Sequence, residues 1–388
     1  MATENPSPST ANEGQEVASS KTPSAMDTTP IQLGQIEVLQ ILNEHGEVDE
    51  GLEPNYTNDE LIDMYTSMVR ARAFDKRMLT MQRQGRMGTF APNLGQEACI
   101  AGQVYPLLKE DWYAPSYRSF GAQIMRGWPM EHLMRLWAGF HDGFPPPQDV
   151  NDMPFSIVIG SHVLPAVGIG MGMTYKNDPN CVVVNYGDGA SSQGAVSEAL
   201  NFAAVYKAPV VFVCENNGWA ISTPTEKQAS SEHFAKRGVA FDVPSIRVDG
   251  NDLFAMIKAT EEATTRARNG KGPTLIEAVT YRMSLHTTAD DPTVYRKDSE
   301  VEAWEKRCPL LRFELYLKSK GVIEQHDIEA IATACDEEVI EARDKLYEMD
   351  PADPTEIFDF MHIEMTEELK EQKDEYLKRL SNKGVTDE

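Results

Sequence analysis

Two short motifs place side chains that could bind a metal directly after runs of apolar residues. Asp188 stands between two glycines after the run 181–186, and Asn217 stands in an Asn-Asn-Gly turn after the run 209–214. The glycines allow tight turns and close approach of a ligand to the backbone. One carboxylate with neutral oxygens suits Mg²⁺, which usually keeps phosphate oxygens and water in its coordination shell. Together the motifs favour a site for Mg²⁺ and a diphosphate.

Each motif alone also fits an ordinary turn or helix cap, because glycine, asparagine and aspartate all favour turns. The metal interpretation depends on both motifs ending neighbouring strands. In open parallel sheets, ligands bind outside the carboxyl ends of the strands. The elements around the motifs therefore decide between the two interpretations.

The middle of the chain alternates between apolar runs and amphipathic segments. Strands are predicted at 181–186, 209–214, 245–248 and 274–280, and helices at 192–206, 228–237 and 252–268. Continuous apolar strands that alternate with helices indicate a parallel sheet covered on both faces. The expected fold class is therefore α/β, with helical extensions at both ends, and both motifs lie at carboxyl ends of strands.

Four segments are expected along the chain. They are a disordered tail at 1–30, an extended arm at 31–56, the ligand-binding α/β domain at 57–345 and a C-terminal helical segment at 346–388. The tail is rich in Ser, Thr and Pro and has almost no large apolar groups, so it cannot offset the entropy of ordering. Thr57 and Glu60 have the spacing of a capping box, which predicts a helix that runs to about Gln84.

Composition excludes several classes of function. Hydrophobic residues make up 41% and charged residues 25% of the chain, which is typical of a globular protein. The net charge of −25 argues against binding nucleic acid or an anionic membrane surface. Residues 153–175 carry no formal charge, but their glycines, prolines and serines argue against a membrane span. Five cysteines that are scattered in sequence, and an N-terminus without an apolar signal core, favour the cytoplasm.

The motifs and their surroundings resemble the alpha subunits of thiamine diphosphate-dependent 2-oxo acid dehydrogenases, those of the pyruvate dehydrogenase component in particular. The segments that carry the resemblance are 95–98, 117–118, 187–194, 214–223 and 286–296. The spacing of the two motifs, across residues 190–215, is that of the thiamine diphosphate motif. The resemblance covers roughly residues 35–380 and implies that 57–345 is a thiamine diphosphate-binding domain.

The resemblance implies a role for each motif residue. Asp188, Asn217 and the backbone carbonyl of Trp219 would bind Mg²⁺, with diphosphate oxygens and water completing the octahedron. Gly189 and Ala190, at the start of the following helix, would offer backbone N–H groups to the diphosphate.

Further cofactor contacts are implied outside the two motifs. Tyr117 and Arg118 match the family's Tyr-Arg pair, in which the guanidinium neutralises diphosphate; a surface salt bridge is the alternative for Arg118. Ile157 and Ile159 align with backbone positions that hold the aminopyrimidine. His286, in a polar loop with few apparent anchors, would contact the diphosphate and assist the reacting intermediate as a neutral or cationic imidazole.

The implied activity is oxidative decarboxylation of pyruvate with reductive acetylation of a lipoyl group, which feeds acetyl-CoA formation. The family works as an α2β2 heterotetramer with a beta subunit, beside a lipoyl-bearing acyltransferase core. Branched-chain 2-oxo acid and acetoin dehydrogenases are the alternatives within the superfamily. A silent scaffold is disfavoured by the intact motif residues, and a nicotinamide dehydrogenase by the absence of a G-x-G-x-x-G turn after the strands.

Overall fold

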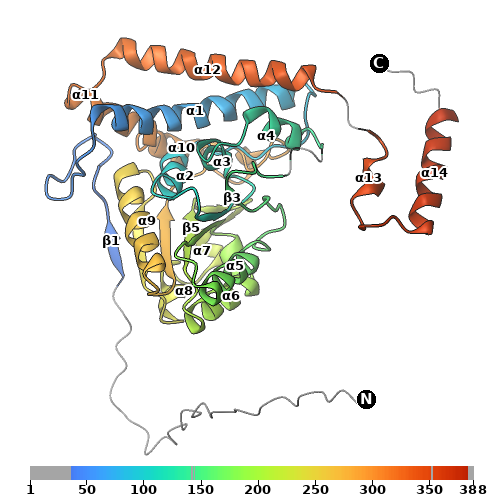
Figure 1. Ribbon diagram of the computed structural model, residues 1–388. Helices are drawn as coiled ribbons and strands as arrows, with labels where there is room; N and C mark the ends of the chain where they lie inside the picture. Colours follow the sequence, from blue (N-terminus) through green and yellow to red (C-terminus); the bar gives the residue numbers. More distant parts are fainter. Residues whose placement is uncertain (1–35, 141–142, 144, 351–352, 383–388) are drawn as a thin grey trace, which may run out of the picture. The chain divides into compact units, whose positions relative to one another are not determined.

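A computed structural model describes residues 36–140, 143, 145–350 and 353–382 (Figure 1). The predicted tail, residues 1–30, lies outside the described part of the chain.

The centre of the described chain is a seven-stranded parallel sheet in the order β1-β8-β9-β5-β4-β2-β3. Its strands are β1 (Glu37–Leu39), β2 (Trp112–Ala114), β3 (Asn151–Asp152), β4 (Val182–Gly187), β5 (Val210–Asn216), β8 (Ser245–Asp249) and β9 (Thr274–Val279). The four strands predicted from apolar runs are confirmed as β4, β5, β8 and β9. The other three have two or three residues each, too few for a hydrophobic pattern.

Both faces of this sheet are buried, which explains why its strands are continuously apolar. Along β4, Val183 packs into one core while Val182 packs into the other, and Val211 and Val210 divide in the same way along β5. Successive side chains of a strand point to opposite faces, so the positions of the central strands β4 and β5 are buried on both faces, whereas the edge strand β1 is largely exposed. The predicted α/β class is therefore confirmed.

Helix α1 (Asn58–Arg83) begins at the predicted capping box. The Thr57 Oγ1 accepts the Glu60 backbone N–H at 3.3 Å, and the Glu60 carboxylate accepts the Thr57 N–H at 2.7 Å. Gln84 is the C-cap, and Gly85 follows at a φ of 72°. The predicted start and end of this helix are both confirmed.

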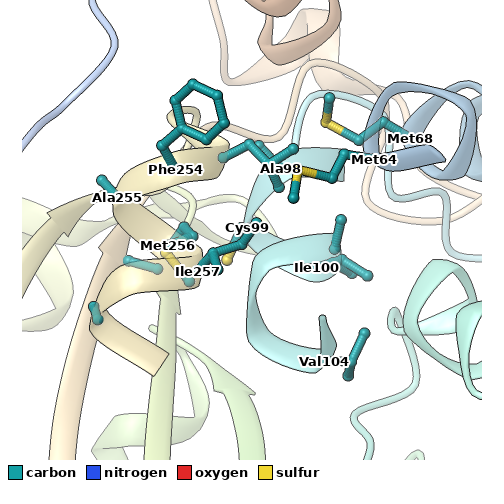
Figure 2. Packing of buried hydrophobic residues seen from close by; sticks show 14 of the residues in the cluster. Met64, Met68, Ala98, Cys99, Ile100, Val104, Phe254, Ala255, Met256 and Ile257 are labelled. Carbon is teal, nitrogen blue, oxygen red and sulfur yellow. The ribbon is translucent and has the colours of Figure 1, made fainter. Parts of the chain in front are cut away.

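Helices α2 (Glu97–Val104) and α9 (Leu253–Arg268) cover one face of the sheet, and α1 packs outside α2. Figure 2 shows apolar side chains of all three helices meeting in one cluster. The helices approach so closely that a Cβ on Gly102 would lie 2.4 Å from the Met256 Cβ. This packing holds the start of α2, which contacts the candidate site.

Helices α5 (Val163–Lys176) and α6 (Gly194–Val205) cover the other face, opposite α9 in Figure 1. Between β4 and α6 lies a short 3₁₀ turn, η2 (Ala190–Ser192). The predicted helix 192–206 therefore starts at Gly194. Within the described ranges, none of the helices combines the length and apolar character that crossing a bilayer requires.

The predicted helix at 228–237 does not form as one element. Two four-residue helices, α7 (Thr225–Gln228) and α8 (Lys236–Val239), stand at its ends. Between them the Ser231 Oγ donates to the His233 carbonyl at 3.0 Å. Such local bonds from serine to the backbone compete with helical hydrogen bonds.

The remaining elements complete the fold. They are α3 (Phe120–Met125), α4 (Met130–Trp137), β6 (Trp219–Ala220), β7 (Thr223–Pro224), η3 (Pro292–Val294), α10 (Asp298–Glu305), α11 (Pro309–Ser319), α12 (Gln325–Glu348), α13 (Glu356–Asp359) and α14 (Glu367–Asn382). Within the segment 31–56, β1 adds to the sheet edge, and Asp252 accepts the backbone N–H groups of Ile41 and Leu42 at 2.5 and 2.7 Å. Helix α12 packs along α1 (Figure 1).

Candidate functional site

A cavity of about 270 Å³ opens at the carboxyl ends of β4 and β5. The strands are in register there, with Gly187 opposite Glu215, so the residues that follow them are neighbours. Nine of the residues predicted from the sequence line this cavity: Tyr117, Arg118, Ile159, Asp188, Gly189, Ala190, Asn217, Trp219 and His286. Ile157 is not among the lining residues, and its side chain is 62% exposed.

Asp188 is almost completely buried, with 1% of its surface exposed. Its Oδ2 has no hydrogen-bond partner among the described residues. Burial raises the pKa of this carboxyl to about 6, although backbone N–H groups and the charge of Arg282 act in the opposite direction. A buried carboxylate oxygen without a partner is costly unless a cation or donor completes it.

Asn217 and Trp219 are held by hydrogen bonds beside Asp188. The Asn217 Oδ1 accepts the Trp219 backbone N–H at 3.2 Å, and its Nδ2 donates to the Gln96 Oε1 at 3.1 Å. Arg282 reaches the Trp219 carbonyl oxygen at 3.5 Å. Both amide and carbonyl oxygens therefore have fixed orientations at the cavity.

These donors fit a hard cation such as Mg²⁺. The described residues contain no group of three or more His, Cys, Asp or Glu side chains that could hold a metal by themselves. One carboxylate with two neutral oxygens is instead a partial set, suited to an ion that keeps phosphate oxygens and water. The unpartnered Asp188 Oδ2 is the observation that supports the fit.

Arg118 is buried at the cavity wall and 5% exposed. Its guanidinium donates to the Pro92 carbonyl, and its Nη2 donates to the His286 carbonyl at 3.0 Å. Among the described residues it forms no ion pair with a carboxylate, so the surface salt bridge is wrong. Glu215 and Asp75 interact with its charge without pairing directly, so the guanidinium remains available to an anion in the cavity.

His286 is held between two arginines. Its Nδ1 lies 3.1 Å from the Arg118 Nη2 and 3.2 Å from the Arg282 Nη1. Burial and these two charges lower the pKa of His286 to about 3. The imidazole is therefore neutral at physiological pH, and because Nδ1 accepts from both arginines, the proton is on Nε2.

The loop that carries His286 has more anchors than its sequence indicates. Asp290 accepts the His286 backbone N–H at 2.7 Å and the Tyr295 hydroxyl at 2.5 Å. Thr288 and Phe90 exchange two hydrogen bonds, at 2.9 and 3.0 Å. The expectation of few anchors is wrong, because Asp290 braces the loop internally while Phe90 and Arg118 bind it to segments that are remote in sequence.

Comparison with known proteins identifies the family of this chain. The dehydrogenase E1 component family matches residues 65–355. The chain belongs to this family. The pyruvate dehydrogenase E1 component subunit alpha of Acholeplasma laidlawii is 42% identical over 339 residues, which are 86% of this chain and 97% of the relative. Proteins of the same name in Staphylococcus aureus (strain Mu50 / ATCC 700699) and Staphylococcus epidermidis are 39% identical over 348 residues, 89% of this chain and 94% of theirs.

The E1 component family depends on thiamine diphosphate. Several lining or supporting residues of this site had not been singled out from the sequence. Val158 and Ile221 form part of the apolar wall, Glu215 faces the cavity from β5, and Arg282 supports His286. Ile221 has a φ of 57°, a strained value for a β-branched residue. No local motif marks these positions, although Glu215 directly precedes the Asn-Asn turn.

Gly189 and Ala190 lie where the chain leaves β4 for the short turn η2. Gly189 caps that turn, and α6 begins only after it, so the backbone N–H groups at the cavity belong to a 3₁₀ turn. A Cβ on Gly189 would lie 3.0 Å from the Ala220 Cβ. A side chain at this position would therefore press against the opposite cavity wall.

Proposed function

We propose that this chain is the alpha subunit of a pyruvate dehydrogenase that binds thiamine diphosphate and Mg²⁺. The observation that carries the proposal is the cavity in which Asp188, Arg118 and His286 meet, in a chain of the E1 component family. Pyruvate is preferred over branched-chain 2-oxo acids and acetoin because the relatives at 39–42% identity are named for pyruvate. A cytoplasmic location is part of the proposal and agrees with five free thiols.

Each side chain has a role toward the cofactor. Asp188, the Asn217 Oδ1 and the Trp219 carbonyl would hold Mg²⁺, and the Arg118 guanidinium would neutralise the diphosphate together with backbone N–H groups of the turn at Gly189 and Ala190. When bound, thiamine diphosphate supplies a nucleophilic ring carbon and the electron sink for decarboxylation.

The other cavity residues would orient the cofactor and shield the reaction. The Nε2–H of His286 faces outward from its two arginines and would donate a hydrogen bond to the diphosphate or to oxyanion charge. Tyr117 packs edge-on against His286, with ring centroids 6.3 Å apart. Val158 and Ile159 would exclude water beside the aminopyrimidine, which the backbone around Ile157 and Ile159 would contact.

The complete reaction needs partners. A beta subunit would supply the glutamate that contacts the aminopyrimidine, in an α2β2 heterotetramer. Pyruvate would lose carbon dioxide, and the remaining two-carbon unit would be oxidised to an acetyl thioester as a lipoyl disulfide is reduced. The lipoyl group would be carried by the acyltransferase core of the complex.

The test is a comparison of substrates and metals in the tetramer reconstituted with a beta chain. We expect a higher kcat/KM for pyruvate than for 4-methyl-2-oxopentanoate, and loss of activity on Mg²⁺ chelation that added Mg²⁺ restores. Extra methylene groups discriminate by only about 1–3 kcal/mol each, so the ratio must be measured with both acids under identical conditions. A higher value for the branched acid would overturn the pyruvate assignment.

A further inference from the structure

Asn185 interrupts the apolar sequence of β4 with an amide that is completely buried. Its Oδ1 accepts the Ser116 backbone N–H at 2.7 Å. Its Nδ2 donates to the Ser119 Oγ at 2.7 Å and to the Glu215 Oε1 at 2.6 Å. Both ends of the amide are therefore engaged, as a buried polar side chain requires.

The two serines bracket the residues that face the cavity. Ser116 and Ser119 close a turn, in which the Ser119 N–H donates to the Ser116 carbonyl at 3.2 Å and the two hydroxyls lie 3.0 Å apart. Tyr117 and Arg118 occupy the centre of this turn. Asn185 thus binds the backbone N–H of the residue before the pair and the side-chain hydroxyl of the residue after it.

Glu215 determines which way the amide points. Its carboxylate accepts from Asn185 and also from the Gln103 Nε2 at 3.0 Å, on helix α2. Because the Ser116 N–H can only donate and the Glu215 carboxylate accepts, the Asn185 oxygen must face the turn. A polar chain therefore runs from α2 through β5 and β4 to the turn.

Stability of β4 alone gives no reason for this amide. The three preceding strand positions and the paired Val213 are valines, and an apolar side chain at Asn185 would avoid the cost of burying an amide. A polar group retained in such a place is expected to specify a geometry.

We propose that Asn185 is a positioning residue for Arg118, and that Glu215 fixes the orientation of the Asn185 amide. The inference rests on the proposed function, because the position of Arg118 matters only if the cavity binds a diphosphate. Asn185 fixes the Ser116–Ser119 turn, and the turn presents the Arg118 guanidinium to the cavity.

The test exchanges donor and acceptor in the hydrogen bond between Asn185 and Glu215. Asn185→Asp is isosteric but places a carboxylate against Glu215 and removes the donor to Ser119. We expect the dissociation constant for thiamine diphosphate to rise about 10- to 100-fold, the usual effect of removing an orienting contact. Binding is titrated at fixed Mg²⁺ in the complex with the beta subunit, and the thermal unfolding midpoint is followed in parallel.

The double variant Asn185→Asp/Glu215→Gln should rescue binding to within about threefold of the wild type, because donor and acceptor are exchanged. The amide introduced at position 215 would donate to the carboxylate introduced at position 185. It would also donate to Gln103, whose Oε1 has no partner among the described residues and can turn toward it. The Ser119 hydroxyl can rotate to donate to the new carboxylate. A merely structural role predicts that the thermal midpoint falls and recovers together with binding, whereas a positioning role predicts a change in binding at a nearly constant midpoint.

Three further variants separate the possible outcomes. Asn201→Asp makes the same change on the exposed face of α6 and should bind as the wild type does. Arg118→Ala should bind thiamine diphosphate weakly. If this variant binds the cofactor normally, the role of Arg118 in the proposed function is wrong and the inference is wrong with it. If Arg118→Ala is weak but Asn185→Asp binds within about threefold of the wild type, or the double variant shows no rescue, the positioning role alone is overturned. If Asn185→Asp does not fold, Ser119→Ala tests the same contact, and normal binding by that variant overturns the inference.

Discussion

At the scale of single residues, Asp188 combines burial with an unpartnered oxygen. Such a group costs free energy in the unliganded fold, and a bound cation would offset that cost. We therefore expect Asp188→Ala to weaken thiamine diphosphate binding on the order of 10³-fold, because several charge-assisted contacts of about 1.5–3 kcal/mol disappear together. The thermal midpoint of the unliganded complex should change little, because removal of a costly buried carboxylate is offset by the loss of its hydrogen bonds from backbone N–H groups.

The control for this prediction is Asp178→Ala, an exposed aspartate in the loop that precedes β4. It should bind the cofactor as the wild type does. The measurement is a titration of thiamine diphosphate at fixed Mg²⁺ for wild type and both variants. If Asp188→Ala binds within about threefold of the wild type, the metal site belongs to another residue.

His286 gives a second prediction at this scale. Its folded pKa of about 3 lies below the unperturbed value of 6.5. The unfolded chain therefore binds the extra proton between these values, so this histidine's contribution to stability is present above pH 6.5 and is lost as the pH falls toward 3. In spectra of the unliganded complex with labelled histidine, the signal that is absent in His286→Asn should remain that of the neutral Nε2–H tautomer from pH 8 to about 5. A signal that titrates with a midpoint near 6.5 would contradict the arrangement.

What could be predicted for single residues depended on whether their signal is local. Asp188 and Asn217 lie in short motifs, so their meeting at one cavity follows from two adjacent parallel strands. Arg282 and Asn185 have no such signal, because the carbonyls that Arg282 binds, on Trp219 and Ile221, and the serine that Asn185 binds lie on segments brought together only by the fold. For Ile157 the expected contact is through the backbone, which says nothing of where a side chain points, and this residue lies outside the cavity lining.

At the scale of elements, the sequence was sufficient where periodicity or capping chemistry is strong. The capping box of α1 and the long strands β4 and β5 were predicted with nearly correct bounds. Strands β1 to β3 are short, and their pairing with the sheet is a long-range property. The helix expected at 228–237 failed because local serine bonds to the backbone replace helical ones.

The capping box supplies an element-scale prediction. Thr57→Ala removes the acceptor for the Glu60 N–H and should reduce the free energy of unfolding by about 0.5–2 kcal/mol. Thr80→Ala is the matched control: this threonine is exposed inside the same helix, where alanine is the better helix former, so stability should stay equal or rise by up to about 0.7 kcal/mol. Urea unfolding of both variants measures the difference. Equal losses in the two would show that the cap contributes nothing specific.

At the scale of the whole molecule, the cavity carries the residues that we propose for Mg²⁺ and the diphosphate, but few groups for the aminopyrimidine. The carboxylates among its lining residues are Asp188 and Glu215. Glu215 already accepts two hydrogen bonds from neighbouring amides, and Asp188 is the ligand that we propose for the metal. No further carboxyl group is present among the described lining residues, which agrees with a second chain as the source of the glutamate proposed to contact the aminopyrimidine.

The last prediction follows from the proposed sharing of the site between this chain and the beta subunit. The purified chain alone should show no oxidative decarboxylation of pyruvate in a dye-reduction assay. Proton exchange on the aminopyrimidine needs a positioned acid or base whose pKa lies near the working pH. Adding the beta chain should restore activity in proportion to tetramer formed, as measured by size-exclusion chromatography. The beta chain alone is the first control, and the Asp188→Ala chain mixed with beta is the second: it should assemble but remain inactive, which separates assembly from cofactor chemistry. Full turnover by the isolated chain, with no association of copies or partners, would show that the site is complete without a second subunit.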